Sequence, residues 1–174
     1  MKTLQAVCFS VLASAFMING ASAQPSSMGS CLSNDFVEFD GNIVEAAVAT
    51  PELSTLVDAV IAAGLDEELA TTENITVNAP TNDAFGAVPA DILDTIVGDV
   101  DLLTAVLTYL VTPSVEDVRR YSEAYARPTL QGQQVYFDRY GSTPRVNNAG
   151  ASCTGVRASN GNVWIIDSVL LPNL

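Results

Sequence analysis

The last stretch of the chain, from Ser159 to Pro172, limits most strongly what this sequence can fold into. It contains Asn160-Gly161, and Asn-Gly is the strongest short signal for a β-hairpin, because a two-residue type I′ turn needs a positive φ at both central positions. The run that follows is rich in β-branched and aromatic residues and stops at Pro172. Such a run between turn signals is typical of a strand. The sequence therefore predicts a buried strand, entered through a tight turn.

A second stretch, from Thr76 to Phe85, predicts a strand that runs into a capped helix. The strand covers residues 75–79 and ends at a proline. Thr81 follows that proline and can cap a short helix that carries Phe85. Asn82 and Asp83 fall in the first turn of this helix, where side-chain acceptors suit the free N–H groups. We expect their side chains to tie the strand-to-helix corner by hydrogen bonds to the backbone.

In this order and at this separation, the two stretches resemble the paired signature segments of the fasciclin (FAS1) domain. The resemblance spans about residues 42–172 and implies a compact β-wedge or flattened barrel of about seven strands, flanked by N-terminal helices. The signature positions are Thr81, Asn82, Asp83, Phe85, Asn160, Gly161, Asp167 and Pro172. We interpret them as mainly structural, with a role in partner contact as the alternative.

The rest of the chain divides into a helical first part and a strand-rich second part. The clearest helix has Thr50 as a cap, Pro51 at its first position and Gly64 just past its end. Its apolar residues recur at helical spacing: Leu53, Leu56, Val57, Val60 and Ile61. Other helices are predicted over residues 42–50, after Pro89, and from Asp99 or Asp101 to before Pro113. Strands are predicted over residues 134–140, 143–147, 153–158, 162–166 and 168–171. Segregated helices and strands indicate an α+β fold.

The first 23 residues are typical of a secretory signal peptide. Lys2 precedes an apolar run, and Ala21-Ser22-Ala23 forms a small-residue cleavage site. The run is shorter than the ~20 residues that a membrane span needs, and Gln24 stands where a lipoprotein would have cysteine. We therefore expect a secreted or periplasmic protein without a membrane anchor, with a tail over residues 24–41 and a fasciclin-like domain over residues 42–174.

Cleavage of the signal peptide would leave two cysteines, Cys31 and Cys153. In an oxidising compartment an even number of cysteines favours a disulfide, and two permit one intrachain pairing. This bridge would anchor the N-terminal tail to the domain. An intermolecular bridge and two free thiols are the alternatives.

Charge is distributed unevenly along the chain. Residues 24–118 contain 17 Asp or Glu and no Lys or Arg, whereas residues 119–174 contain six Arg and three acidic residues. This acidic balance argues against nucleic-acid partners and against anionic membranes, because both would repel the chain. We interpret the carboxylates as a solubilising coat rather than as a functional acidic patch.

The composition also excludes most catalytic chemistry. The chain contains no histidine, which removes imidazole bases, Ser-His-Asp sites and nearly all zinc catalysis. Paired carboxylates could hydrolyse glycosides, but the acidic clusters at residues 66–68, 99–101 and 116–117 fall at expected helix starts or turns. None of these clusters has the alternating loop of a calcium hand. We predict no catalytic residue, no cofactor and no metal site.

The arginines follow the acidic part, and Tyr121, Tyr125, Tyr136 and Tyr140 lie beside them in the sequence. Arg and Tyr are enriched at binding hot spots. We therefore consider Arg139, Arg145, Tyr136 and Tyr140 as a candidate binding face on the sheet. The alternative is that the arginines pair with the protein's own carboxylates.

The resemblance implies a non-enzymatic, monomeric module of adhesion or matrix contact that binds an extracellular protein or polysaccharide. In animal members, integrin contact involves a Tyr-His pair and an Asp-Ile pair. Here Leu110 follows Tyr109, and Gly155-Val156 stands at the second position, so we do not expect integrin-type recognition. The alternative function is a carrier of a small ligand or lipid, with an apolar cleft between helices and sheet. A glycosidase is a third and weaker possibility.

The charge distribution predicts that salt stabilises this protein. The carboxylates of residues 24–118 have no cation among them, so their mutual repulsion falls as salt screens it. The thermal midpoint of the mature protein should rise between low salt and ~1 M sodium chloride. A flat or falling midpoint would mean that the carboxylates are already compensated locally.

Overall fold

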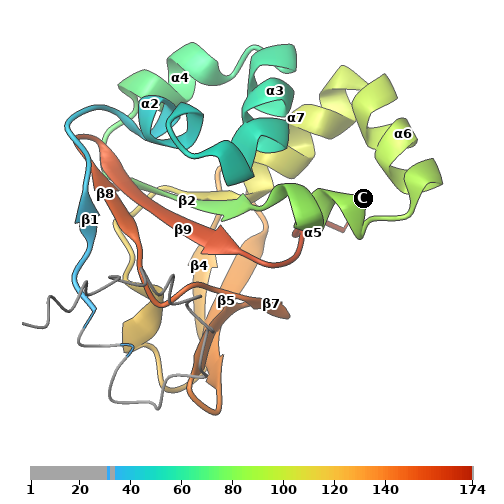
Figure 1. The fold of residues 1–174 in the computed structure, drawn as a ribbon. Coiled ribbons are helices and arrows are strands. Elements are labelled where there is room, and N and C mark those ends of the chain that lie inside the picture. The colour runs from blue at the N-terminus through green and yellow to red at the C-terminus, as the bar shows by residue number, and fades with distance from the viewer. Residues whose placement is uncertain (1–30, 32–33, 174) are drawn as a thin grey trace, which may run out of the picture.

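The structure, a computed structural model, describes Cys31 and residues 34–173. The predicted signal peptide and residues 24–30 of the predicted tail lie outside these residues. Figure 1 shows the helices gathered on one side of the molecule and the strands beneath them.

The helices that the structure describes lie between residues 43 and 120. They are α2 (Ile43–Val48), α3 (Ser54–Ala62), α4 (Asp66–Thr71), α5 (Asn82–Gly86), α6 (Ala90–Gly98) and α7 (Val100–Tyr109), with short 3-10 helices at Pro51–Leu53 and Val118–Arg120. Capping explains several of the starts. Asn42 forms a capping box with Glu45, Thr81 accepts a hydrogen bond from Ala84 N, and Asp99 accepts from the first turn of α7.

The strands form two sheets. The first has the order β1-β8-β9-β2-β3, built from Val37–Glu38, Val156–Ala158, Gly161–Ile166, Ile75–Pro80 and Val111–Thr112. The second has the order β4-β5-β6-β7, built from Tyr125–Pro128, Gln134–Tyr140, Thr143–Val146 and Ala149–Gly150. An antiparallel bridge between Ala151 and Ile166 joins them. The α+β prediction is confirmed, and among the described strands the sheets form an open wedge rather than a closed barrel.

The core lies on both sides of β2, which is buried at all six positions. It pairs in parallel with β9 from Ile75–Gly161 to Pro80–Ile166. Strands buried on both faces are typical of parallel pairs. On the helical side Val77 contacts α2, α3 and α4, while Trp164 of β9 and Phe137 of β5 are fully buried.

The final hairpin differs from the predicted type I′ turn. Ala158 pairs with Gly161, so Ser159 and Asn160 form the connection, and neither Asn160 nor Gly161 has a positive φ. Gly161 is required for space instead, because a Cβ there would lie 1.9 Å from the carbonyl oxygen of Ile75. The Asn-Gly pair thus located the hairpin correctly, but the glycine is needed because β2 lies so close to β9 at this position.

Other predicted boundaries are wrong in part. Residues 168–171 form no strand, because the chain leaves the sheet after β9 and carries Val169 toward the helices. Strand β8 begins at Val156 rather than at Cys153. Thr50 makes no cap; its hydroxyl donates to Ala46 O, and the helix after it begins as a 3-10 turn. Part of the predicted tail is strand β1, which pairs with β8.

Replacing Gly161 with Ala should destabilise the protein strongly. The added methyl would collide with the backbone of β2, and relief requires the two central strands to separate. We expect the free energy of unfolding to fall by about 2 kcal/mol or more, measured by urea denaturation. Gly98→Ala is the control, since nothing lies within 4 Å of a Cβ at that helical position. It should leave stability unchanged or raise it. Equal effects of the two changes would contradict the close approach.

Candidate functional site

The first signature segment holds helices together. Thr81 caps α5, as the sequence indicated. The side chain of Asn82 does more than tie the strand-to-helix corner: it accepts from Thr55 N at 3.0 Å and donates to Pro51 O at 3.1 Å. Asp83 is exposed, and Phe85 is buried. Asn82 therefore links the start of α5 to the start of α3.

The second signature segment has a similar role. Asn160 is buried; its Oδ1 accepts from Ile43 N at 2.9 Å, and its Nδ2 donates to Leu69 O at 2.8 Å. These bonds tie the final hairpin to α2 and α4. Asp167 accepts from Gly150 N at 2.8 Å, which joins the end of β9 to β7, and Pro172 is buried.

The candidate binding face divides between two sides of the second sheet. Tyr136 and Tyr140 are 49% and 75% exposed, and Arg145 lies beside Tyr140 with its guanidinium 5.3 Å from the ring centroid. We call these three residues the tyrosine face. Arg139 projects to the opposite side, with buried Val135 and Phe137, and donates to Arg119 O. Its inclusion in one face with the tyrosines was therefore wrong, because alternate residues of a strand point to opposite sides.

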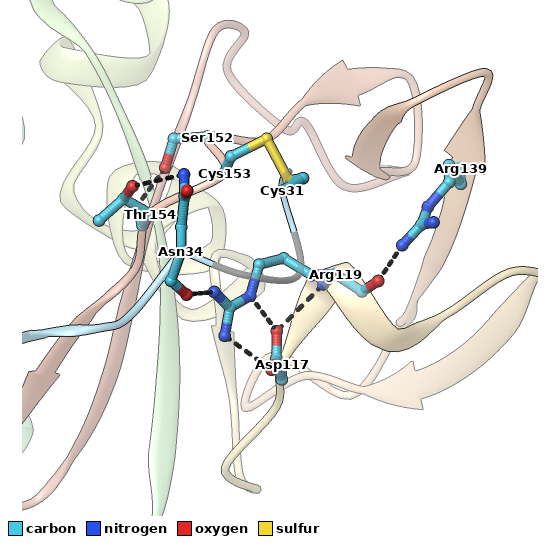
Figure 2. Close-up of a disulfide and its surroundings, with 8 residues drawn as sticks. All are labelled: Cys31, Asn34, Asp117, Arg119, Arg139, Ser152, Cys153 and Thr154. Atoms are coloured by element: carbon cyan, nitrogen blue, oxygen red, sulfur yellow. Dashed lines mark hydrogen bonds and ion pairs between the residues drawn. A yellow bond between two sulfur atoms is a disulfide. The ribbon is translucent and has the colours of Figure 1, made fainter. Parts of the chain in front are cut away.

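Arg119 is a buried structural arginine (Figure 2). Its Nε and Nη2 donate to the two oxygens of Asp117 at 2.8 and 2.9 Å, and Nη1 donates to Asn34 O. The guanidinium carbon lies 4.7 Å from the Phe36 ring centroid and 5.3 Å from that of Trp164. Burial opposes ionisation of Asp117, yet the hydrogen bonds from Arg119 hold the pKa of that carboxyl below its usual value. Beside this cluster, Cys31 and Cys153 are joined by a disulfide with Cα atoms 4.9 Å apart.

Glu116 is a second buried junction. Its carboxylate accepts from Arg127 Nε at 2.6 Å, from Ser114 Oγ and from the hydroxyl of Tyr121. Its carbonyl oxygen accepts from Trp164 Nε1 at 2.9 Å. Burial and the neighbouring Glu116 raise the pKa of Tyr121 to about 12. The hydroxyl therefore stays protonated and donates to the carboxylate across the physiological range.

The arginines mostly pair with the protein's own carboxylates. The ion pairs are Arg119–Asp117, Arg120–Asp117, Arg127–Glu116, Arg145–Asp138 and Arg157–Glu38. This favours the pairing interpretation over a basic binding face. What remains exposed on the second sheet is aromatic and hydrogen-bonding surface.

A shallow polar cleft of about 580 Å³ adjoins Tyr136. The amide side chains of Gln133, Gln134 and Asn147 line it. Tyr109 reaches it with its hydroxyl, which donates to Gln134 O at 3.2 Å and accepts from Asn147 Nδ2 at 3.0 Å. Since the ring of Tyr109 is buried, this tyrosine supports the cleft rather than presenting a contact surface.

An apolar cavity of about 290 Å³ lies among α3, α5, α6 and α7. Between the helices and β2 the remaining space is only about 30 Å³. The apolar cleft of the carrier interpretation was expected between helices and sheet; the larger hollow lies within the helical layer instead, because side chains fill the interface with β2. Within residues 34–173 and Cys31, no cluster of three His, Cys, Asp or Glu is placed to hold a metal ion. No described helix is long and apolar enough to cross a membrane.

A helical layer over an open wedge, in which the two signature segments pair as parallel strands, defines a FAS1-type fold. The fasciclin domain profile matches residues 51–172, and the chain belongs to the fasciclin domain family.

Its relatives include bacterial proteins. Immunogenic protein MPB70 of Mycobacterium bovis is 36% identical over 135 residues, which cover 75% of this chain and 68% of the relative. Protein sll1483 of Synechocystis is 38% identical over 132 residues, covering 75% and 73%. Cell surface glycolipoprotein MPB83 of M. bovis is 37% identical over 134 residues, covering 75% and 60%.

A solved FAS1 domain pair from the insect cell adhesion molecule Fasciclin I superposes with a TM-score of 0.53. It covers 68% of this chain and 45% of that one at 19% identity, so it supports the fold alone.

Sequence reasoning missed the two buried junctions at Glu116 and Arg119. The sequence placed Glu116-Asp117 at a helix start or turn, and it left the arginines that follow between a binding face and pairing with the protein's own carboxylates. The only signal was their order: the first arginines of the chain follow an acidic pair, with Val118 alone between them. That order is compatible with ion pairs between residues two or three positions apart, such as Asp117 with Arg119 and Arg120.

Arg119 and Arg145 should differ sharply when replaced. Arg119→Gln removes the buried guanidinium that donates to both oxygens of the half-buried Asp117, which would keep only the exposed Arg120 as a charge partner, and should lower the free energy of unfolding by about 3 kcal/mol. Arg145→Gln removes a pair at the surface and should cost much less. Urea denaturation of both variants measures the difference. Similar losses would show that Arg119 is not the buried link described above.

Proposed function

We propose that this protein is a non-enzymatic adhesion module of the cell exterior that binds an extracellular protein or polysaccharide through the tyrosine face. The proposal includes export by the N-terminal signal segment and action as a monomer. Membership of the fasciclin family supports it, as does the cell-surface description of the relative MPB83. The absence of histidine from the sequence supports a binding role over catalysis.

The observation that carries the proposal is the exposure of two tyrosines on one side of β5. Burial of large rings is the usual outcome in a folded domain, yet Tyr140 is 75% exposed and Tyr136 adjoins the polar cleft. Tyrosine supplies rigid contact area with a hydroxyl at its edge, which suits both protein and sugar surfaces. Because Arg145 is paired with Asp138, the face carries little net charge and needs no strongly acidic partner.

Removal of both rings should weaken binding without unfolding the domain. We expect the mature Tyr136→Ser/Tyr140→Ser variant to be retained on cell-surface material of the source organism at least about tenfold more weakly. Val48→Ser/Val100→Ser is the matched control, since both valines are more than half exposed but lie on the helical side.

Two treatments of the surface material identify the partner class. Loss of retention after protease digestion indicates a protein, and loss after periodate oxidation indicates a polysaccharide. Equal retention of the tyrosine variant and the wild type would overturn the proposal.

A further inference from the structure

The apolar cavity among the helices has the size and lining of a ligand site. Four helices and the segment after β9 surround it, and Figure 1 shows α6 at the outer edge of this group with α5 and α7 beside it. Most of its lining is aliphatic or aromatic: Ala59, Ala62, Phe85, Val88, Leu93 and Leu107 are representative. Protein interiors are normally packed without voids much larger than a water molecule. A hollow of about 290 Å³ with this lining is close to the lower end of the range for ligand-binding pockets.

The cavity exists because α6 packs loosely against its neighbours. This helix has a single buried residue, Ile96, whereas α7 beside it has four. Val97 is 59% exposed although it lines the cavity, so the cavity opens to solvent on this side. Helix α6 thus stands as one wall of a hollow rather than as a fully packed element.

Volume and polarity limit what the cavity can hold. At the ~30 Å³ that a water molecule occupies in the liquid, it has room for about ten non-hydrogen atoms. An apolar cavity of ~150 Å³ already binds benzene rather than water. Of the lining side chains only Thr55 and Asp58 carry polar groups, so water would find few partners inside. The lining favours a hydrocarbon chain or ring.

Charge further restricts the ligand. Asp58 is the charged residue of the lining, and residues 24–118, which supply all the surrounding helices, contain no Lys or Arg. A carboxylate or phosphate head would meet a negative potential without any nearby cation to bind it.

We propose that this cavity binds a small uncharged lipophile, with Thr55 and Asp58 facing its polar end. This site is independent of the tyrosine face, since its lining contains no residue of the second sheet. It does not depend on the proposed adhesion function.

Calorimetric titration of the mature protein with n-nonanol and with nonanoate tests the proposal. The two probes share the length of hydrocarbon that the cavity can hold and differ in charge. We expect n-nonanol to bind with one molecule per chain, and nonanoate to bind at least about tenfold more weakly at neutral pH. No binding of n-nonanol, or equal binding of both probes, would overturn the proposal.

Two variants place the binding in the cavity. Ala59→Phe fills the hollow and should weaken n-nonanol binding about tenfold or more, while Ala105→Phe on α7, half-buried but outside the lining, should not. Asp58→Lys, at an exposed position of α3, should bring the affinity for nonanoate close to that for n-nonanol. Asp66→Lys on α4 is its control. Unchanged binding by both Ala59→Phe and Asp58→Lys would exclude the cavity as the site.

Discussion

The parallel pairing of β2 with β9 is the constraint on which the rest of the structure depends. The two strands come from signature segments about eighty residues apart, and six residue pairs align them. Their approach requires Gly161, since any side chain would occupy the position of the Ile75 carbonyl. Asn160 then fixes the helices above the pair through hydrogen bonds to α2 and α4. The strands and the helical layer are thus positioned by two adjacent residues.

The second sheet is attached to this pair through the segment around Glu116. Trp164 of β9 donates to the Glu116 carbonyl, and the Glu116 carboxylate binds Arg127 of β4. Two arginines, Arg119 and Arg127, are thus used at buried junctions, while Arg120, Arg145 and Arg157 pair with carboxylates nearer the surface. This arrangement leaves an acidic helical side with an apolar cavity and a sheet side whose exposed feature is aromatic. The helical side and the sheet side differ chemically because the acidic residues and the arginines are separated along the chain.

The sequence predicted the elements that local rules determine and missed those that depend on distant partners. Thr81, Pro89 and Asp99 mark helix starts through capping and fixed backbone geometry, and these starts are confirmed within a residue or two. Residues 168–171 have the composition of a strand but no partner strand, which no local pattern reveals. Arg139 combines both cases: strand alternation alone would have separated it from Tyr136 and Tyr140, whereas its hydrogen bond to Arg119 O depends on the fold. The cavity depends on how loosely α6 packs, which is a tertiary property.

The disulfide has a mechanical consequence under the adhesion function proposed above. Cys31 and Cys153 close a loop that contains every described helix and the tyrosine face. Tension between Cys31 and a partner bound at Tyr140 runs through the short stretch from Tyr140 to Cys153 and across the sulfur–sulfur bond. The helical layer and its cavity lie outside this covalent path. Binding at the tyrosine face can therefore bear tension while the cavity among the helices keeps its shape.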